Sequence, residues 1–241
     1  LIVQENKIKP IDSKELDKFK MGYEEYTIKR GEELTVNAWN DLEVIYNNDL
    51  YICNVILNEL PWVDIISKEE GKIEDKEIIL AIPLLKEQKM DLVLQKATEL
   101  GVTKIIPVTM ERSIVKLDDS KEVKKIDRWS KICKEASEQS KRNSIPVISN
   151  IMTLKELVKE EGIKIVCSTI EKENNLKKFL TEHKNYDKII IVVGPEGGIS
   201  SKEEEYLVSE GFTRVSLGKR IMRVETVPIF ILSALNYEFM E

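Results

Sequence analysis

Ile189-Ile-Ile-Val-Val193 runs directly into Gly194-Pro-Glu-Gly-Gly198, and Ile199-Ser-Ser-Lys-Glu203 follows. An unbroken run of β-branched residues predicts a strand that is buried on both faces. The three glycines around a proline predict a tight turn in which backbone can approach a ligand closely. Either Ser200 with Glu203 or Ser201 with Glu204 fits the S-x-x-E pattern that begins a helix. The segment therefore predicts a strand, a turn and a helix in immediate succession.

The same alternation extends to both sides of this segment. It implies an α/β fold in which helices cover a largely parallel sheet and ligands bind at the carboxyl ends of the strands. Apolar runs and helical periodicity predict strands over 78–82, 105–108, 145–148, 163–167, 188–193 and 215–217, and helices over 86–100, 121–141, 154–159, 176–180, 202–210 and 228–240.

The beginning of the chain has a different pattern. Leu42–Tyr46 and Leu50–Ile56 are rich in β-branched and aromatic residues and flank a polar turn, which predicts a hairpin. The charged stretch 67–77 cannot bury apolar surface and predicts a boundary. We therefore expect a β-rich domain over 1–72 and an α/β domain over 73–241.

Composition excludes several classes of protein. No apolar run approaches the roughly 18 residues that a membrane span needs, and the first residues lack a secretory pattern, so a cytoplasmic protein is expected. The 37 basic and 43 acidic residues give a net charge of −6, which argues against a uniformly basic nucleic-acid-binding surface. Residues 112–146 hold ten basic and six acidic side chains, a pattern that suits either a phosphate-bearing partner or a solvated helix.

The cysteine and histidine content also argues against a metal site and against a Ser-His-Asp catalytic triad. The sequence contains no C-x-x-C pair among Cys53, Cys133 and Cys167, so we expect no cysteine-based metal site. The three cysteines are expected to be small core residues. The single histidine, His183, lies in a polar stretch and predicts an exposed loop residue.

Two turns are the candidate binding elements. The glycine turn, Gly194–Gly198, lacks both common phosphate-binding signatures, and alone it indicates only a tight connection. The basic turn, Leu217–Thr226, holds Arg220, Arg223 and Glu225 before an apolar helix, with Thr226 as a candidate N-cap near Pro228. Charges beside apolar surface are costly unless paired or functional, so an Arg223–Glu225 ion pair is the structural alternative.

Together with four further motifs, the two turns resemble the RsmE family. These proteins are SPOUT-superfamily methyltransferases that modify N3 of a uridine in small-subunit (16S) ribosomal RNA during ribosome biogenesis. The resemblance covers about residues 78–241. It is carried by Met90-Asp91, Gln95–Gly101, Glu111–Ser113 and Glu138–Asn143, followed in order by the glycine turn and by Leu217-Gly-Lys-Arg-Ile-Met-Arg-Val-Glu-Thr226.

The resemblance implies a fold, a cofactor and an assembly. The α/β domain would be a SPOUT-type trefoil-knotted sheet, preceded by a small PUA-like β-barrel that grips RNA, and two protomers would pair through the knotted region and the apolar helix beginning at Pro228. S-adenosylmethionine would lie among three loops, in contact with Ser168, Thr169, Val193, Gly194, Pro195, Glu196, Gly197, Gly198, Leu217, Gly218, Ile221, Met222, Arg223 and Thr226.

The resemblance also implies roles in catalysis and RNA binding. Arg223 and Arg220 would stabilise charge on the uridine ring, and Glu196 or Glu225 would accept a proton or orient the base. The alternative for Glu196 is a structural role, in which its carboxylate caps the turn by accepting hydrogen bonds from backbone N–H groups. RNA contacts would come from Arg112, Gln139, Arg142 and Asn143, and from Arg30 in the first domain, although solvated helix residues have the same composition. The alternatives are a related enzyme that modifies transfer RNA or a ribose hydroxyl, and a non-catalytic RNA-binding protein.

Overall fold

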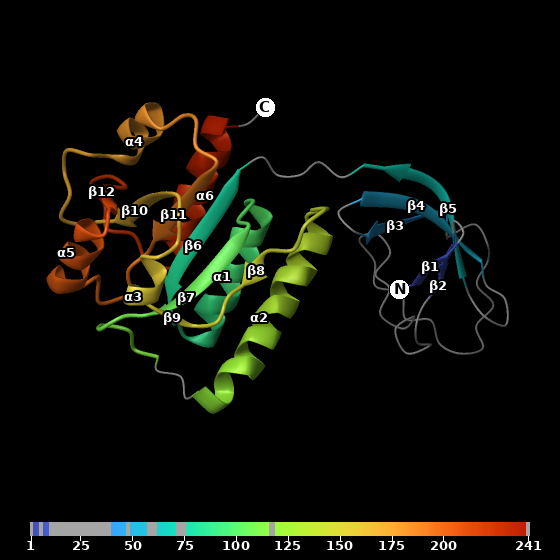
Figure 1. Ribbon diagram of the computed structural model, residues 1–241, viewed down its shortest axis with the longest axis horizontal. Coiled ribbons are helices and arrows are strands. Elements are labelled where there is room, and N and C mark those ends of the chain that lie inside the picture. The colour runs from blue at the N-terminus through green and yellow to red at the C-terminus, as the bar shows by residue number, and fades with distance from the viewer. Residues whose placement is uncertain are drawn as a thin grey trace. The chain divides into compact units, whose positions relative to one another are not determined.

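The computed structural model describes residues 2–4, 7–9, 40–46, 49–56, 62–70, 76–115 and 119–239 (Figure 1). The chain divides into two compact units, Leu1–Ile73 and Glu74–Glu241. None of the helices in the described ranges has the length and apolar character that crossing a bilayer requires.

The first unit contains a five-stranded antiparallel sheet in the order β1-β2-β5-β4-β3. The predicted hairpin is confirmed, because β3 and β4 pair antiparallel with Tyr46 opposite Asp49. Arg30 lies outside the described residues. The strands are β1 (Ile2–Gln4), β2 (Lys7–Lys9), β3 (Asn40–Tyr46), β4 (Asp49–Ile56) and β5 (Trp62–Glu69).

The second unit is built on a parallel sheet in the order β12-β10-β11-β6-β7-β8, and β9 also pairs with β7. The predicted α/β class is therefore confirmed. The strands are β6 (Glu77–Pro83), β7 (Lys104–Thr109), β8 (Val147–Ile148), β9 (Met152–Thr153), β10 (Ile163–Cys167), β11 (Lys188–Val192) and β12 (Thr213–Val215).

Helices cover both faces of this sheet, and successive strand residues pack into opposite layers. Leu80 and Ile82 of β6 join the core beneath α1 (Glu87–Glu99), α2 (Asp119–Gln139), α4 (Leu176–Glu182) and α6 (Thr226–Phe239). Ile79 and Ala81 join the core beneath α3 (Leu154–Leu157) and α5 (Ser201–Ser209). Each fully buried aliphatic side chain contributes about 1.5–3 kcal/mol relative to an exposed one, so burial on two faces explains the apolar runs.

Some predicted boundaries and environments are wrong in detail. The last strand spans Thr213–Val215, two residues earlier than predicted, because Val215 pairs with Cys167 at the end of β10. Strand β9 was not predicted, because its two residues are too few to show the alternation of apolar and polar residues that marks a strand. His183 is half-buried instead of exposed, since it ends α4 and its ring stacks on Phe179 at 4.2 Å.

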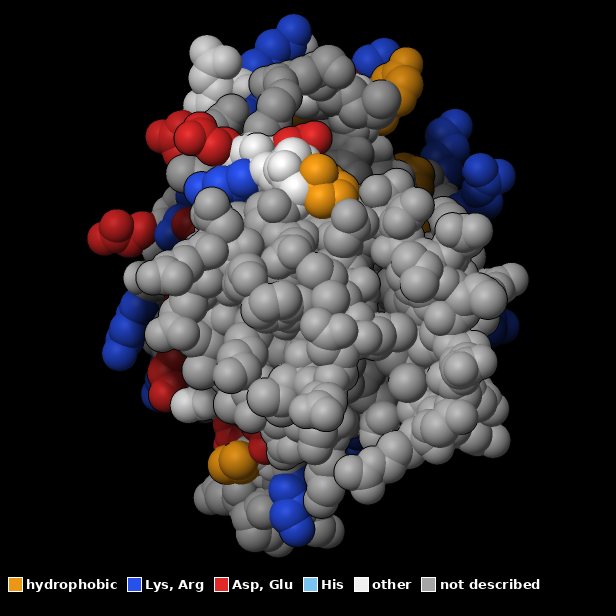
Figure 2. All heavy atoms as spheres, turned by 90° about the vertical axis from the view of Figure 1, so that its right-hand side faces the viewer, with side chains coloured by type: hydrophobic (Ala, Val, Ile, Leu, Met, Phe, Trp, Pro, Cys, Tyr) orange, Lys and Arg blue, Asp and Glu red, His pale blue; other side chains and the backbone are white. Residues whose placement is uncertain are grey.

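The two cysteines whose side chains the structure describes lie in or against the core, and charged side chains of both signs lie on the surface. Cys133 is buried in the core as expected, whereas Cys167 is half-buried against it, and burial raises the pKa of the Cys167 thiol to about 12. The side chain of Cys53 lies outside the description. Lysine and arginine side chains lie beside acidic ones along one margin of Figure 2, in keeping with the 37 basic and 43 acidic residues of the chain.

Candidate active site

Between β6 and β11, the helices that follow the two strands pack on opposite faces of the sheet. These strands are neighbours with Val192 beside Ala81, yet α1 follows β6 on one face and α5 follows β11 on the other. In open α/β sheets a crevice forms outside the carboxyl ends of two such strands, and ligands bind there. The first turn of α1 and the glycine turn therefore meet where the fold favours a site.

Close packing against the next helix shapes the glycine turn. A Cβ added to Gly194 would lie 2.6 Å from Cγ1 of Ile199, which explains why this position has no side chain. Gly198 has a φ of +72°, and its N–H donates to the carbonyl of Pro195 over 2.8 Å. The turn thus reverses the chain tightly enough to bring Ile199 back over the end of β11.

The start of α5 is fixed by one of the two capping pairs that the sequence allowed. Ser200 and Glu203 form a reciprocal capping box, whereas Glu204 is buried and accepts a hydrogen bond from Arg214 Nε over 2.9 Å. Oε1 of Glu203 also accepts a 2.7 Å hydrogen bond from the backbone N–H of Glu111. The cap therefore joins the loop after β7 to the glycine turn.

Arg112 supports the glycine turn directly. Its Nη1 donates to the carbonyl of Gly197 over 3.1 Å, and its Cβ would lie 3.2 Å from a Cβ at Gly197. The sequence predicted an RNA contact for Arg112. In the structure its guanidinium adds a second link between the loop after β7 and the turn, beside the one from Glu111 to Glu203.

The basic turn projects several side chains into solvent. Ile221 is 85% exposed, and Lys219, Arg220 and Arg223 are also exposed. Gly218 has a φ of +115°, which a residue with a Cβ rarely adopts, and the space around its missing side chain is open. The turn therefore has both backbone access and cationic side chains on its surface.

The end of the basic turn is anchored by backbone hydrogen bonds. The carbonyl of Arg223 accepts from the N–H groups of Thr226 and Val227, at 2.9 and 3.2 Å, and Val224 is buried. Thr226 is the first residue of α6 and not a residue before it, so its predicted N-cap position is wrong by one. Arg223 is thus held through its backbone while its side chain remains free to contact a ligand.

Lys89 joins the two turns, although the sequence did not identify it. Its Nζ lies 3.2 Å from Oε1 of Glu196 in the glycine turn and 3.3 Å from Oε2 of Glu225 in the basic turn. The hydrogen bond to Glu196 raises the pKa of Lys89. The contact with Glu225 has the distance of an ion pair without the angles of a hydrogen bond, so the buried Oε2 atom has no hydrogen-bond partner. Glu225 therefore pairs with Lys89, and the ion pair with Arg223 that was the structural alternative is not formed among the described contacts.

Glu225 is held in its ionised form. A hydrogen bond from its own backbone N–H, with smaller contributions from Lys89 and Arg223, keeps the pKa of this carboxyl below its usual value of 4.5. A carboxylate with a lowered pKa is a weak base. This environment favours an orienting role for Glu225 over proton acceptance.

The third loop of the predicted binding site begins at Ser168, directly after β10, and is hydrogen-bonded to β12. The N–H of Ser168 donates to the carbonyl of Val215, and its hydroxyl accepts from Ile170 and Glu171, each over 3.2 Å. Thr169 is exposed. Because the Ser168 hydroxyl is already engaged, this loop offers mainly backbone groups beside the basic turn.

Comparison with known proteins shows to which family this chain belongs. A family described as an RNA methyltransferase domain matches residues 72–236. The chain belongs to this RNA methyltransferase family.

Named relatives narrow the assignment within the RNA methyltransferase family. The ribosomal RNA small subunit methyltransferase E of Bacillus subtilis is 38% identical over 168 residues, which cover 67% of this chain and 66% of that protein. The protein of the same name from Mesomycoplasma hyopneumoniae is 35% identical over 193 residues, covering 78% of this chain and 82% of its own. The resemblance to the RsmE family is therefore confirmed.

A solved structure agrees in fold. The ribosomal RNA small subunit methyltransferase E from Neisseria gonorrhoeae, solved bound to S-adenosyl methionine, has a TM-score of 0.73 and 29% identity. The alignment covers 86% of this chain and 94% of that one.

Three residues predicted to contact RNA lie near the carboxyl end of α2, away from the two turns of this RNA methyltransferase. Nη1 of Arg142 donates to the carbonyls of Thr98 and Val102, at 2.7 and 2.9 Å, and so satisfies the end of α1. Gln139 is exposed and Asn143 is half-buried. The structure brings together Arg112, the glycine turn and the basic turn, but it uses Arg142 elsewhere.

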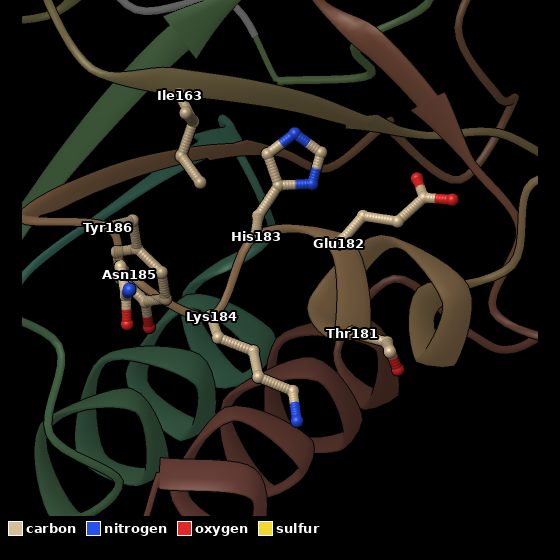
Figure 3. A pocket seen from close by; sticks show the side chains of 7 residues that line it. All are labelled: Ile163, Thr181, Glu182, His183, Lys184, Asn185 and Tyr186. Carbon is tan, nitrogen blue, oxygen red and sulfur yellow. The ribbon is translucent and has the colours of Figure 1, made fainter.

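A pocket lies at the opposite end of the sheet from the two turns, where β10 and β11 begin. It has a volume of about 310 Å³ and is lined by Ile163 and by residues 181–186. Figure 3 shows the His183 ring and Ile163 on the same side of this pocket, with Lys184 pointing away. Its position is remote from the carboxyl ends of the strands. Among the described residues, no group of three or more His, Cys, Asp or Glu side chains is placed to hold a metal ion.

Proposed function

We propose that this RNA methyltransferase transfers a methyl group from S-adenosylmethionine to N3 of a uridine in small-subunit (16S) ribosomal RNA. The observation that carries the proposal is the junction of the glycine turn and the basic turn at Lys89, at the point of the sheet where ligands bind. The names of the relatives and the donor bound to the Neisseria protein support both the reaction and the substrate.

The turns fit a donor that combines a positive charge with a carboxylate and an adenine. Open space at Gly218 allows a ligand to approach the backbone, and the buried Oε2 of Glu225 lacks a hydrogen-bond partner. The donor would contact three segments, which are Ser168 and Thr169 after β10, Val193 to Gly198 after β11, and Leu217, Gly218, Ile221, Met222, Arg223 and Thr226 before α6.

The chemistry requires mainly positioning and charge stabilisation. When bound, S-adenosylmethionine supplies a methyl group on a positively charged sulfur, and the S–C bond breaks as the N3–C bond forms. Alignment of the uridine against the two turns supplies much of the acceleration. The exposed guanidinium groups of Arg223 and Arg220 stabilise negative charge on the uridine oxygens. The N3 proton passes to the Glu196 carboxylate and from there to water, while Glu225, held ionised, orients the base.

RNA recognition is proposed to combine the two units. In the second unit Gln139 and Asn143 would contact the RNA near the end of α2, whereas Arg112 and Arg142 would act chiefly through the backbone carbonyls that they bind. The first unit, a PUA-like barrel over residues 1–72, would add further contacts, with Arg30 among the candidates. Asn and Gln side chains can hydrogen-bond base edges, which suits a single-stranded site.

The proposal extends to topology and assembly. The final segments, from the basic turn into α6, would thread the trefoil knot of a SPOUT methyltransferase domain over residues 73–241. Two protomers would pair along α6, on which Phe230 and Tyr237 are 42% and 82% exposed. Large exposed apolar side chains on one helix face favour such a contact. The enzyme would act in the cytoplasm.

Incubation with S-adenosylmethionine and small ribosomal subunits that lack the modification tests the proposal. We expect one new methyl group, located by mass spectrometry at N3 of a uridine. A methyl group on transfer RNA or on a ribose hydroxyl would replace the proposed substrate by a related one. RNA binding without any methyl incorporation would indicate a non-catalytic RNA-binding protein and end the proposal.

A further inference from the structure

Lys89 occupies a position that local helix chemistry disfavours. It is the third residue of α1, where the positive end of the helix dipole favours acidic side chains. Glu87 and Asp91, four residues apart on one face, pair with Lys125 and Arg128 of α2. Lys89 lies between them in the sequence and pairs instead with carboxylates of the two turns. A lysine at this position therefore has a tertiary role.

The two carboxylates come from segments that no strand pairing joins directly. The glycine turn follows β11 and the basic turn follows β12, and β10 separates these strands in the sheet. The ammonium group of Lys89 spans the gap, at 3.2 Å from one carboxylate and 3.3 Å from the other. One side chain thus sets the distance between two loops that the sheet leaves apart.

We propose that Lys89 is a positioning residue, which holds the glycine turn and the basic turn together so that they form one donor-binding pocket. This inference rests on the proposed function, because the pocket is that of the methyl donor. Lys89 acts through Glu196 and Glu225 and does not itself touch the reacting atoms.

The exposure of the three side chains indicates where the effect of Lys89 should be measured. Lys89, Glu196 and Glu225 are 33%, 24% and 14% exposed. Partly exposed ion pairs contribute little to global stability, even when they order the segments that carry them. The loss of Lys89 should therefore change the two turns and donor affinity much more than it changes the unfolding transition.

The experiment compares the full-length protein with Lys89→Met, Lys89→Arg and the control Lys86→Met. Lys86 precedes α1 and is exposed, so the control removes a nearby positive charge outside the ion-paired group. Hydrogen exchange without ligand should rise severalfold in residues 194–199 and 218–226 of Lys89→Met and remain unchanged over β7. The dissociation constant and the KM for S-adenosylmethionine should rise about tenfold, with a smaller change in kcat, and Lys89→Arg should stay within about threefold of the wild type.

The outcomes separate this inference from the proposed function. Unchanged exchange in either turn of Lys89→Met, unchanged donor affinity, or an equal effect of Lys86→Met would overturn the positioning role and leave methyl transfer by the wild type untouched. Absence of donor binding by the wild-type protein would end the proposed function. In that case the exchange measurement still decides whether Lys89 joins the turns, because it needs no donor.

Discussion

Arg112 and Gly197 are joined by a hydrogen bond of 3.1 Å from the guanidinium Nη1 to the backbone carbonyl oxygen. The contact links the loop after β7 to the glycine turn, which is also linked through Glu196 to Lys89 of α1. The glycine turn is thus held from two neighbouring connections, and its conformation depends on residues far away in the sequence.

Replacement of Arg112 by methionine should weaken donor binding in the absence of RNA. A charge-assisted hydrogen bond to an exposed carbonyl contributes about 1 kcal/mol, so the dissociation constant for S-adenosylmethionine should rise about fivefold by calorimetry. If Arg112 acts only on RNA, donor affinity will instead be unchanged and only the KM for RNA will rise.

Gly194→Ala should destabilise the second unit. The added Cβ would lie 2.6 Å from Cγ1 of Ile199 and 3.1 Å from its backbone nitrogen, so the turn must shift. Overpacking of this kind costs about 1–3 kcal/mol, measurable by urea unfolding. The double variant Gly194→Ala/Ile199→Ala should lose less stability than the two single effects added together. Simple additivity would show that the two positions do not clash.

Arg223→Ala should fold normally and bind the donor, yet transfer the methyl group much more slowly. The backbone of Arg223 anchors α6 while its side chain is exposed, so truncation leaves the anchor intact. Loss of charge stabilisation in a transition state reduces kcat about 10²-fold, as single-turnover kinetics would show. The neighbouring exposed residue gives the control Lys219→Ala, which should keep its rate. Unchanged turnover in Arg223→Ala would remove Arg223 from the mechanism.

The buried thiol of Cys133 should resist alkylation in the folded protein, and the half-buried thiol of Cys167 should react slowly because its pKa is raised. Burial raises the pKa of both, to about 12 for Cys167, and only the thiolate reacts. In a Cys53→Ser background, labelling of Cys133 at pH 8 should follow the unfolding rate and become fast in denaturant. Rapid labelling under native conditions would contradict the burial.

Phe230→Glu should prevent self-association if α6 forms the proposed dimer. Phe230 and Tyr237 are seven residues apart, so they lie on one face of the helix, and a buried carboxylate there would be costly. Sedimentation analysis should show a dimer for the wild type and a monomer for Phe230→Glu. The control Glu205→Lys, exposed on α5, should remain dimeric. A monomeric wild type would refute the dimer.

Hydrophobic periodicity predicted most of the second unit correctly. The helix predicted over 86–100 is present as α1, and its apolar residues Met90, Val93, Leu94 and Ala97 are all fully buried. Strands such as β11 were predictable because burial on both faces requires continuous apolar sequence. These elements were predictable because each is determined by the spacing of apolar residues within its own segment, and that spacing can be read from a single sequence.

The site was predictable only in part because its contacts join distant segments. The two turns were identified from glycine, proline and charge, but the lysine between them was not, since Lys89 and Glu196 are 107 residues apart. Arg142 is the converse case. Its sequence context suggested RNA, whereas the open carbonyls of Thr98 and Val102 determine where its guanidinium binds. Pattern identifies which residues are unusual, and tertiary structure determines their partners.

The strand order β12-β10-β11-β6-β7-β8 also constrains how the protein is synthesised. β6 begins at Glu77, but its neighbour β11 begins only at Lys188, so one edge of β6 stays unpaired while more than a hundred further residues leave the ribosome. An open strand edge invites association with other chains, and pairing distant in sequence is slow. Truncated or stalled nascent chains of this protein should therefore be prone to aggregation and depend on chaperones until β11 emerges.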